Sequence, residues 1–181
     1  MKVILILIFG LSTVFAQETS TKSIAVGEDA PTFALPDIEQ NYISLRDFCG
    51  EKLRKPWINK EKHVVLLSFF ATWCKPCMAE IPHLESIAQR YRGKNVKLFL
   101  IDVGEDQQKV AEFIAAKNIS LPVLIDRYQT VAEKYDALTL PRLFVIDKEG
   151  TIRKENKGFT DPEKFTRELT EMIDDLLKSR S

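Results

Sequence analysis

The fold of this chain is decided by the stretch Val64-Val65-Leu66-Leu67-Ser68-Phe69-Phe70-Ala71-Thr72-Trp73-Cys74-Lys75-Pro76-Cys77. Residues 64–70 form an apolar run, which is typical of a strand that is buried on both faces of a sheet. A helix is predicted directly afterwards, from about Cys74 to Arg92, because apolar residues then recur at helical spacing. The sequence therefore places two cysteines, separated by two residues, where a buried strand gives way to a helix.

Strand and helix patterns continue to alternate on both sides of this stretch. Further strands are predicted at 96–103, 121–125, 143–146 and 151–153, and further helices at 106–117, 130–135 and 161–178. Ahead of it, residues 32–35 and 42–45 alternate in the manner of strands and predict a β-hairpin. This order predicts an α/β fold with a central mixed β-sheet flanked by helices and an N-terminal β-hairpin extension.

The composition is that of a globular protein and offers no reason to expect a nucleic-acid partner. The chain has 181 residues, of which 45% are hydrophobic and 29% charged, enough for one domain with its own core. Its 26 basic residues balance its 26 acidic residues. Because binding of a phosphate backbone needs a basic surplus, we expect no nucleic acid to bind.

The first sixteen residues differ from the rest of the chain. Lys2 is followed by a mainly apolar stretch that ends in small residues before Gln17. This pattern predicts a signal peptide over residues 1–16 and an exported protein, with an uncleaved membrane anchor or a buried helix as the alternatives. Residues 17–30 form a polar lead-in to a domain over 31–178, in which residues 46–62 are a charged insertion, either a loop or a short helix, before the first core strand.

Cys74 and Cys77 are the candidates for chemistry. Cys74 would lie at a helix N-terminus, where unpaired N–H groups and the helix dipole stabilise a thiolate and lower the thiol pKa. Lys75 adds a positive charge beside it. Cys77 lies one turn further on, close enough to attack a mixed disulfide held on Cys74. The pair is therefore predicted to be a redox-active disulfide.

Two other uses of the cysteine pair compete with redox chemistry. A structural zinc site needs four ligands, and the remaining candidates, Cys49, His63 and His83, are scattered along the chain. A purely structural disulfide that closes so short a loop would constrain little of the unfolded chain. We therefore expect redox use and no metal, although the sequence alone leaves both alternatives open.

The segment Phe69-Phe70-Ala71-Thr72-Trp73-Cys74-Lys75-Pro76-Cys77-Met78-Ala79-Glu80-Ile81-Pro82 resembles the active-site segment of thioredoxin-fold proteins. It is most similar to the exported branch that includes the TlpA type, the ResA type and other cytochrome c maturation thioredoxins. The resemblance covers about residues 26–178 and includes residues 26–35 and 140–147. It implies the thioredoxin fold and a thiol–disulfide oxidoreductase activity that needs no cofactor.

The resemblance also implies roles for residues around the cysteine pair. Trp73 would pack beside the nucleophile and help to form the surface on which a client docks, together with Lys75 and Pro76. Pro141 corresponds to the family's cis-proline opposite the cysteines, and the backbone of Leu140 would pair with an extended client segment. A core position for Trp73 and a trans bond before Pro141 are the alternatives.

Glu80 is the third candidate catalytic residue. It lies three residues beyond Cys77, on the same helical face. In ResA-like proteins a glutamate at this position lies beneath the cysteines and assists proton transfer, and the resemblance implies the same role here. Burial near two sulfur atoms would raise its pKa, which suits a group that donates and accepts protons. The alternative is a solvated carboxylate on the helix surface.

Together these expectations describe an exported reductase of disulfides in client proteins. Cys74 would attack the client, Cys77 would resolve the mixed disulfide, and a membrane thiol electron donor would then reduce the pair again. The haem-binding cysteines of apocytochrome c are one candidate client, as the resemblance implies. We expect the protein to be a monomer.

Two other functions on the same fold require cysteine motifs that differ from the one in this chain. A peroxiredoxin-like thiol peroxidase needs Pro-x-x-x-Thr-x-x-Cys, but Leu67 and Ala71 occupy the proline and threonine positions ahead of Cys74. A copper or haem chaperone would use a Cys-x-x-x-Cys spacing with a distant histidine, and the spacing here is one residue shorter. Cys49 is interpreted as a buried, inert thiol, with a resolving or partner-binding thiol as the alternative.

Overall fold

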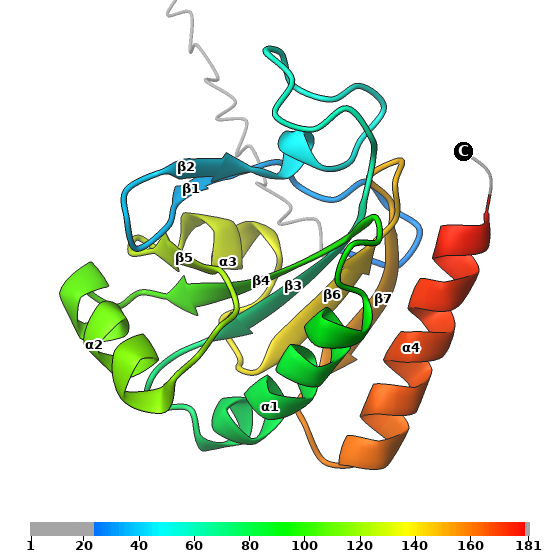
Figure 1. Ribbon diagram of the computed structural model, residues 1–181. Helices are drawn as coiled ribbons and strands as arrows, with labels where there is room; N and C mark the ends of the chain where they lie inside the picture. Colours follow the sequence, from blue (N-terminus) through cyan, green and yellow to red (C-terminus); the bar gives the residue numbers. More distant parts are fainter. Residues whose placement is uncertain (1–23, 180–181) are drawn as a thin grey trace, which may run out of the picture.

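A computed structural model describes residues 24–179 of the chain and shows a five-stranded sheet with helices on both faces (Figure 1). The predicted signal peptide, residues 1–16, lies outside the described residues. The strand order is β5-β4-β3-β6-β7. β3 pairs in parallel with β4 and antiparallel with β6, so the sheet is mixed, as predicted.

The observed elements follow the predicted order. The strands of the main sheet are β3 (Val64–Phe70), β4 (Val96–Val103), β5 (Val123–Asp126), β6 (Arg142–Ile146) and β7 (Ile152–Lys157). The helices are α1 (Lys75–Arg90), α2 (Gln107–Lys117), α3 (Thr130–Lys134) and α4 (Pro162–Lys178). A separate two-stranded sheet consists of β1 (Ala34–Pro36) and β2 (Tyr42–Ser44), and a 3-10 turn, η1 (Leu45–Asp47), follows it.

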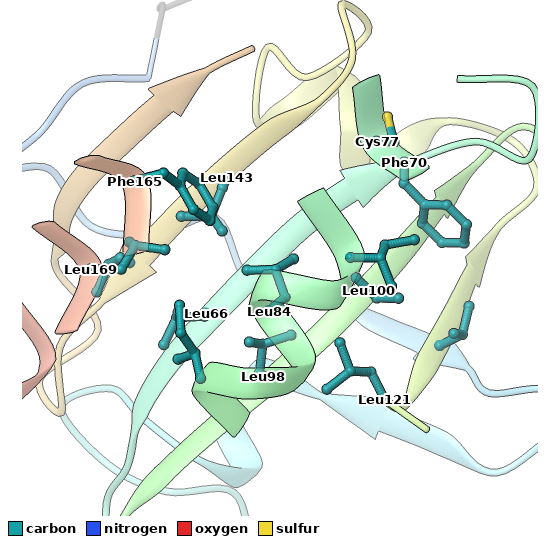
Figure 2. Close-up of a cluster of buried hydrophobic side chains, with 14 of the residues drawn as sticks. Leu66, Phe70, Cys77, Leu84, Leu98, Leu100, Leu121, Leu143, Phe165 and Leu169 are labelled. Atoms are coloured by element: carbon teal, nitrogen blue, oxygen red, sulfur yellow. The ribbon is translucent and has the colours of Figure 1, made fainter. Parts of the chain in front are cut away.

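β3 is the centre of the molecule, and every one of its seven residues is buried. Because successive side chains of a strand point to opposite faces, β3 contributes to two separate hydrophobic clusters. Leu66 and Phe70 belong to the cluster beneath α1, which Figure 2 shows. Val65, Leu67 and Phe69 belong to the cluster on the other face. The apolar run of the sequence is thus explained by burial on both sides.

The helices are divided between the two faces. α1, α2 and α4 contribute to the cluster shown in Figure 2, in which Leu84 of α1 and Leu169 of α4 are completely buried. The connections β3–α1–β4 and β4–α2–β5 each join two parallel strands, and such crossovers are right-handed in nearly all proteins. Both crossovers move in the same direction along the sheet, and this places α1 and α2 on the same face. α3 and the N-terminal segment cover the opposite face.

The N-terminal segment is bridged to the rest of the fold, and the insertion is held by contacts of its own. Isolated bridges join Asp29 to Thr151 and Asp37 to Leu124. The insertion is a loop after η1, and Arg54 binds the buried carboxylate of Asp47 with two hydrogen bonds of 2.6 and 2.9 Å. It leads into the start of β3, whereas the cysteine pair follows the end of β3. The insertion and the cysteine pair therefore lie at opposite ends of the sheet (Figure 1).

Among residues 24–179, no helix combines the length and the apolar character that crossing a bilayer requires. α4, with 17 residues, has an apolar stripe directed at the sheet and charged residues on its other side. Such a helix is typical of the surface of a globular domain.

Leu84 offers a direct test of the packing between α1 and the sheet. Its side chain is completely buried, so Leu84→Ala should lower the free energy of unfolding by about 2–5 kcal/mol, measured by urea denaturation. Ser86→Ala, at an exposed position of the same helix, is the control and should change it by less than about 0.5 kcal/mol. Equal effects of the two substitutions would contradict the described packing.

Candidate functional site

Cys74 and Cys77 form a disulfide at the junction of β3 and α1, with their Cα atoms 5.3 Å apart. Cys74 is the N-cap of α1, and its Sγ accepts a hydrogen bond from the backbone N–H of Cys77 at 3.3 Å. This N–H group is one of those that have no partner within a helix. When the disulfide is reduced, the same group and the helix dipole favour a thiolate on Cys74.

The two sulfur atoms are buried, but the residues around them are not. Cys74 is 3% exposed and Cys77 is 1% exposed, and Figure 2 shows Cys77 in the buried cluster with Phe70. Trp73, by contrast, is 69% exposed. The prediction of an exposed docking residue therefore fits better than the alternative of a core aromatic.

Lys75 and Pro76 extend the exposed surface beside Trp73. Both lie in the first turn of α1, where proline is tolerated because its missing N–H would have no helical partner. A client that approaches the disulfide would meet these side chains before it met the sulfur atoms.

The loop before β6 lies at the same end of the sheet. The peptide bond between Leu140 and Pro141 is cis, as the resemblance implied. Phe69 is paired with Arg142, so the residues that follow β3 and those that precede β6 are neighbours. Leu140 is half-buried, and none of the backbone hydrogen bonds found outside helices and strands in residues 24–179 involves it. The structure thus brings Leu140 and Pro141 to the end of the sheet that carries the cysteines.

Glu80 is 1% exposed and faces the sheet from α1, so the alternative of a solvated carboxylate is wrong. Its Oε1 accepts a hydrogen bond from the hydroxyl of Ser68 at 3.0 Å, while Oε2 has no partner. Burial raises the pKa of Glu80 to about 7, although the Ser68 hydrogen bond lowers it in part. A carboxyl group with this pKa exchanges its proton readily near neutral pH.

A pair of buried carboxyl groups, Asp102 and Glu105, lies beside the same junction and was missed by sequence reasoning. Glu105 accepts hydrogen bonds from the backbone N–H of Thr72 at 2.5 Å and from its hydroxyl at 2.8 Å. Asp102 accepts a hydrogen bond from the backbone N–H of Glu105 at 3.1 Å. Thr72 and Glu105 are 33 residues apart, and neither belongs to a recognisable motif, so no signal in the sequence connects them.

Cys49 lies apart from this site. It is 1% exposed and belongs to the hydrophobic cluster on the face of the sheet away from α1. Burial raises the pKa of its thiol to about 12, and its Sγ–H donates weakly to the carbonyl of Leu45 at 3.8 Å. These observations support the interpretation of Cys49 as an inert core thiol, because the sheet separates it from the cysteine pair.

The histidines lie apart from the cysteine pair as well. His63, directly before β3, is buried against Phe48, and His83 of α1 contacts Thr166 of α4. Within the part of the chain that the structure describes, no three side chains of His, Cys, Asp or Glu are arranged as metal ligands.

Comparisons with known proteins agree with this geometry. The sequence profile of the AhpC/TSA family matches residues 26–155. The chain is 32% identical over 140 residues to the thiol–disulfide oxidoreductase ResA of Bacillus thuringiensis subsp. konkukian, covering 77% of this chain and 74% of that protein. It is 31% identical over 169 residues to ResA of Geobacillus thermodenitrificans, covering 92% of this chain and 90% of that protein.

A solved structure extends the similarity to the fold. The crystal structure of StoA from Bacillus subtilis matches with a TM-score of 0.59 at 25% identity, covering 76% of this chain and 96% of StoA. The matched region of the family profile contains both cysteines, the buried glutamate and the loop before β6. The chain therefore belongs to the AhpC/TSA family of thioredoxin-fold proteins and is a thiol–disulfide oxidoreductase related to ResA.

Proposed function

We propose that this protein reduces disulfides in client proteins outside the cytoplasm, with Cys74 as the nucleophile and Cys77 as the resolving thiol. The observation that carries the proposal is the hydrogen bond from the Cys77 N–H to the Cys74 sulfur at the N-terminus of α1. It singles out Cys74 as the sulfur that is stabilised as a thiolate, because the helix terminus acts on the capping residue first.

The reaction consists of two exchanges of sulfur bonds. The Cys74 thiolate attacks one sulfur of the client disulfide, forms a mixed disulfide and releases the other client sulfur as a thiolate. The Cys77 sulfur, once deprotonated, then attacks Cys74 and releases the second client thiolate. The client gains two electrons and, after protonation, two thiols, and the protein is left with the Cys74–Cys77 disulfide that the structure contains.

Glu80 is suited to move the proton of Cys77. Both side chains are buried on the same face of α1, one turn apart, and the proton of Cys77 therefore has no direct access to water. With a pKa of about 7, ionised Glu80 accepts this proton during reduction of a client, and protonated Glu80 returns it in the reverse reaction. Ser68 holds the carboxyl group in place through the hydrogen bond to Oε1.

Trp73, Lys75, Pro76 and Leu140 provide the surface on which the client would dock. The exposed Trp73 ring and half-buried Leu140, at the same end of the sheet, offer apolar contact, and the backbone of Leu140 offers hydrogen bonds to an extended client segment. Contact of this kind depends on main-chain geometry, so it would accept clients of different sequence.

The oxidised protein must be reduced again by a two-electron thiol donor. The predicted signal peptide supports a location outside the cytoplasm, where a membrane thiol protein would supply these electrons. The name ResA of the relatives and the resemblance to cytochrome c maturation thioredoxins make apocytochrome c a candidate client. Peroxide is a less suitable substrate, because Ala71 occupies the position where a peroxidase would carry threonine.

The two cysteines should respond differently to substitution. Cys74→Ser should abolish reduction of insulin in the presence of dithiothreitol, because the attacking thiolate is lost. Cys77→Ser should instead accumulate a mixed disulfide with the substrate, visible on non-reducing gels and by mass spectrometry. Cys49→Ala is the control and should reduce insulin like the wild type. Consumption of peroxide without any exchange of insulin disulfides would overturn the proposed function.

Substitutions of Glu80 and Ser68 should change the pH dependence of thiol–disulfide exchange in different ways. In the wild type, the rate of the resolving step should rise with pH through about 7 as Glu80 ionises. Glu80→Gln should slow this step and remove the inflection, whereas Ser68→Ala should move it to higher pH, because the hydroxyl hydrogen bond lowers the pKa of Glu80. Stopped-flow measurements over a pH series test both, and an unchanged profile in Glu80→Gln would remove Glu80 from the mechanism.

Glu80 should also make the stability of the protein depend on pH. The unfolded chain loses this proton near the ordinary value of 4.5, but the folded chain keeps it up to about 7, so folding becomes less favourable as the pH rises between these values. Gln does not titrate, so Glu80→Gln should not lose this stability. The unfolding free energy of Glu80→Gln minus that of the wild type should therefore increase by about 3 kcal/mol from acidic to mildly alkaline pH. Urea denaturation of the oxidised proteins measures the difference, and parallel pH curves would contradict the raised pKa.

A further inference from the structure

We propose that Glu105 is a positioning residue of this enzyme: by holding Thr72 it fixes the turn that presents Trp73 to the client. The inference rests on the proposed function, because it concerns how a client reaches Cys74. It extends that function to a carboxylate on a different strand-to-helix connection, between β4 and α2, which makes no hydrogen bond to sulfur within residues 24–179.

The residues between β3 and α1 form one tight turn. The backbone N–H of Cys74 donates to the carbonyl of Ala71 at 3.0 Å, so Thr72 and Trp73 are the two central residues of this turn. Thr72 is tied down twice, because Glu105 accepts from both its N–H and its hydroxyl. Trp73 is exposed, and its indole N–H makes no hydrogen bond to any residue between 24 and 179. The orientation of Trp73 therefore depends on how firmly Thr72 is held.

The fold brings Glu105 to this turn through the pairing of two parallel strands. Phe70, the last residue of β3, is paired with Asp102 of β4, so the residues that follow both strands emerge side by side. Gly104 has φ of +84°, which turns the chain directly after β4 and before Glu105. The distance between Thr72 and Glu105 is thus set by the sheet and does not rely on flexible loops.

The surroundings of Glu105 keep it in the ionised form that accepts two hydrogen bonds. Burial by itself would raise the pKa of Glu105, but the hydrogen bonds from Lys109 and Thr72 outweigh it and the pKa lies below the ordinary value. The Nζ of Lys109, in the first turn of α2, lies 2.5 Å from Oε1 of Glu105. Burial, and next the adjacent Glu105, raise the pKa of Asp102 to about 8, so this second carboxyl group stays neutral near neutral pH. A single negative charge therefore faces Thr72.

The test compares single-turnover reduction of insulin by the reduced full-length variants. Glu105→Gln replaces one of the two accepting oxygens with an amide NH₂ group, which cannot accept a hydrogen bond from Thr72. Thr72→Val removes the hydroxyl donor but keeps the shape of the side chain. Each substitution should raise the insulin concentration that gives half the maximal rate about tenfold, because hydrogen bonds between the turn and a charged group are lost. The rate at saturating insulin should stay within about twofold of the wild-type rate. Thr72→Ser retains the hydroxyl and should behave like the wild type.

A matched control and a small reagent separate positioning from general damage. Glu112→Gln makes the same charge change at a surface position of α2 and should have no effect. Alkylation of reduced Cys74 by iodoacetamide needs no docking surface, so its rate should be unchanged in Glu105→Gln. In a Trp73→Ala background the effect of Glu105→Gln should vanish, because the two residues act through one turn. A fall in alkylation that parallels the fall in insulin reduction would assign Glu105 a purely structural role and overturn the inference.

Fluorescence tests the turn without any client. The chain has two tryptophans, and a Trp57→Phe background leaves Trp73 as the single reporter. Glu105→Gln and Thr72→Val should lower the fluorescence anisotropy of Trp73, while Thr72→Ser and Glu112→Gln should not. Unchanged anisotropy in Glu105→Gln would contradict the inference even if insulin is reduced. Failure of the wild type to reduce insulin would instead contradict the proposed function, with the anisotropy result still deciding the role of Glu105.

Discussion

The hydrogen bond between the Cys77 N–H and the Cys74 sulfur is the interaction on which the rest of this site depends. It exists because β3 ends directly before α1, so that the first free N–H groups of the helix point at the residue that caps it. All other features act on this junction. The sheet packs against it, and we propose that Glu80 exchanges a proton with Cys77 and that the exposed turn presents a client to Cys74.

Burial and hydrogen bonding together set the protonation state of the carboxyl groups around the cysteine pair. Glu80 and Asp102 are nearly inaccessible to water and have raised pKa values, because desolvation penalises their charged forms. Glu105 is almost as buried, but Lys109 and Thr72 stabilise its charge. Of the three carboxyl groups, two therefore have raised pKa values and one has a lowered pKa. The same principle explains Cys49, whose thiol stays protonated because burial, and next the charge of Asp147, raise its pKa.

Most of the fold could be predicted from the sequence, because β3 and β4 are apolar runs with clear ends. The differences have local causes. β5 begins at Val123 because Pro122 cannot donate to a ladder, and it includes Asp126 because the backbone of that residue pairs with Val103 of β4. β7 extends to Lys157 although it is charged, since an edge strand tolerates such residues. The Thr72–Glu105 contact could not be predicted, because only the strand register brings these residues together.

The proposed chemistry requires that α1 holds Cys74 as a thiolate when the disulfide is reduced. The most direct measurement is the pKa of the Cys74 thiol in the reduced protein, obtained from the pH dependence of its alkylation with Cys77 replaced by serine. We expect a pKa well below the value of about 8.5 for a free cysteine. A value at or above that of a free cysteine would contradict it.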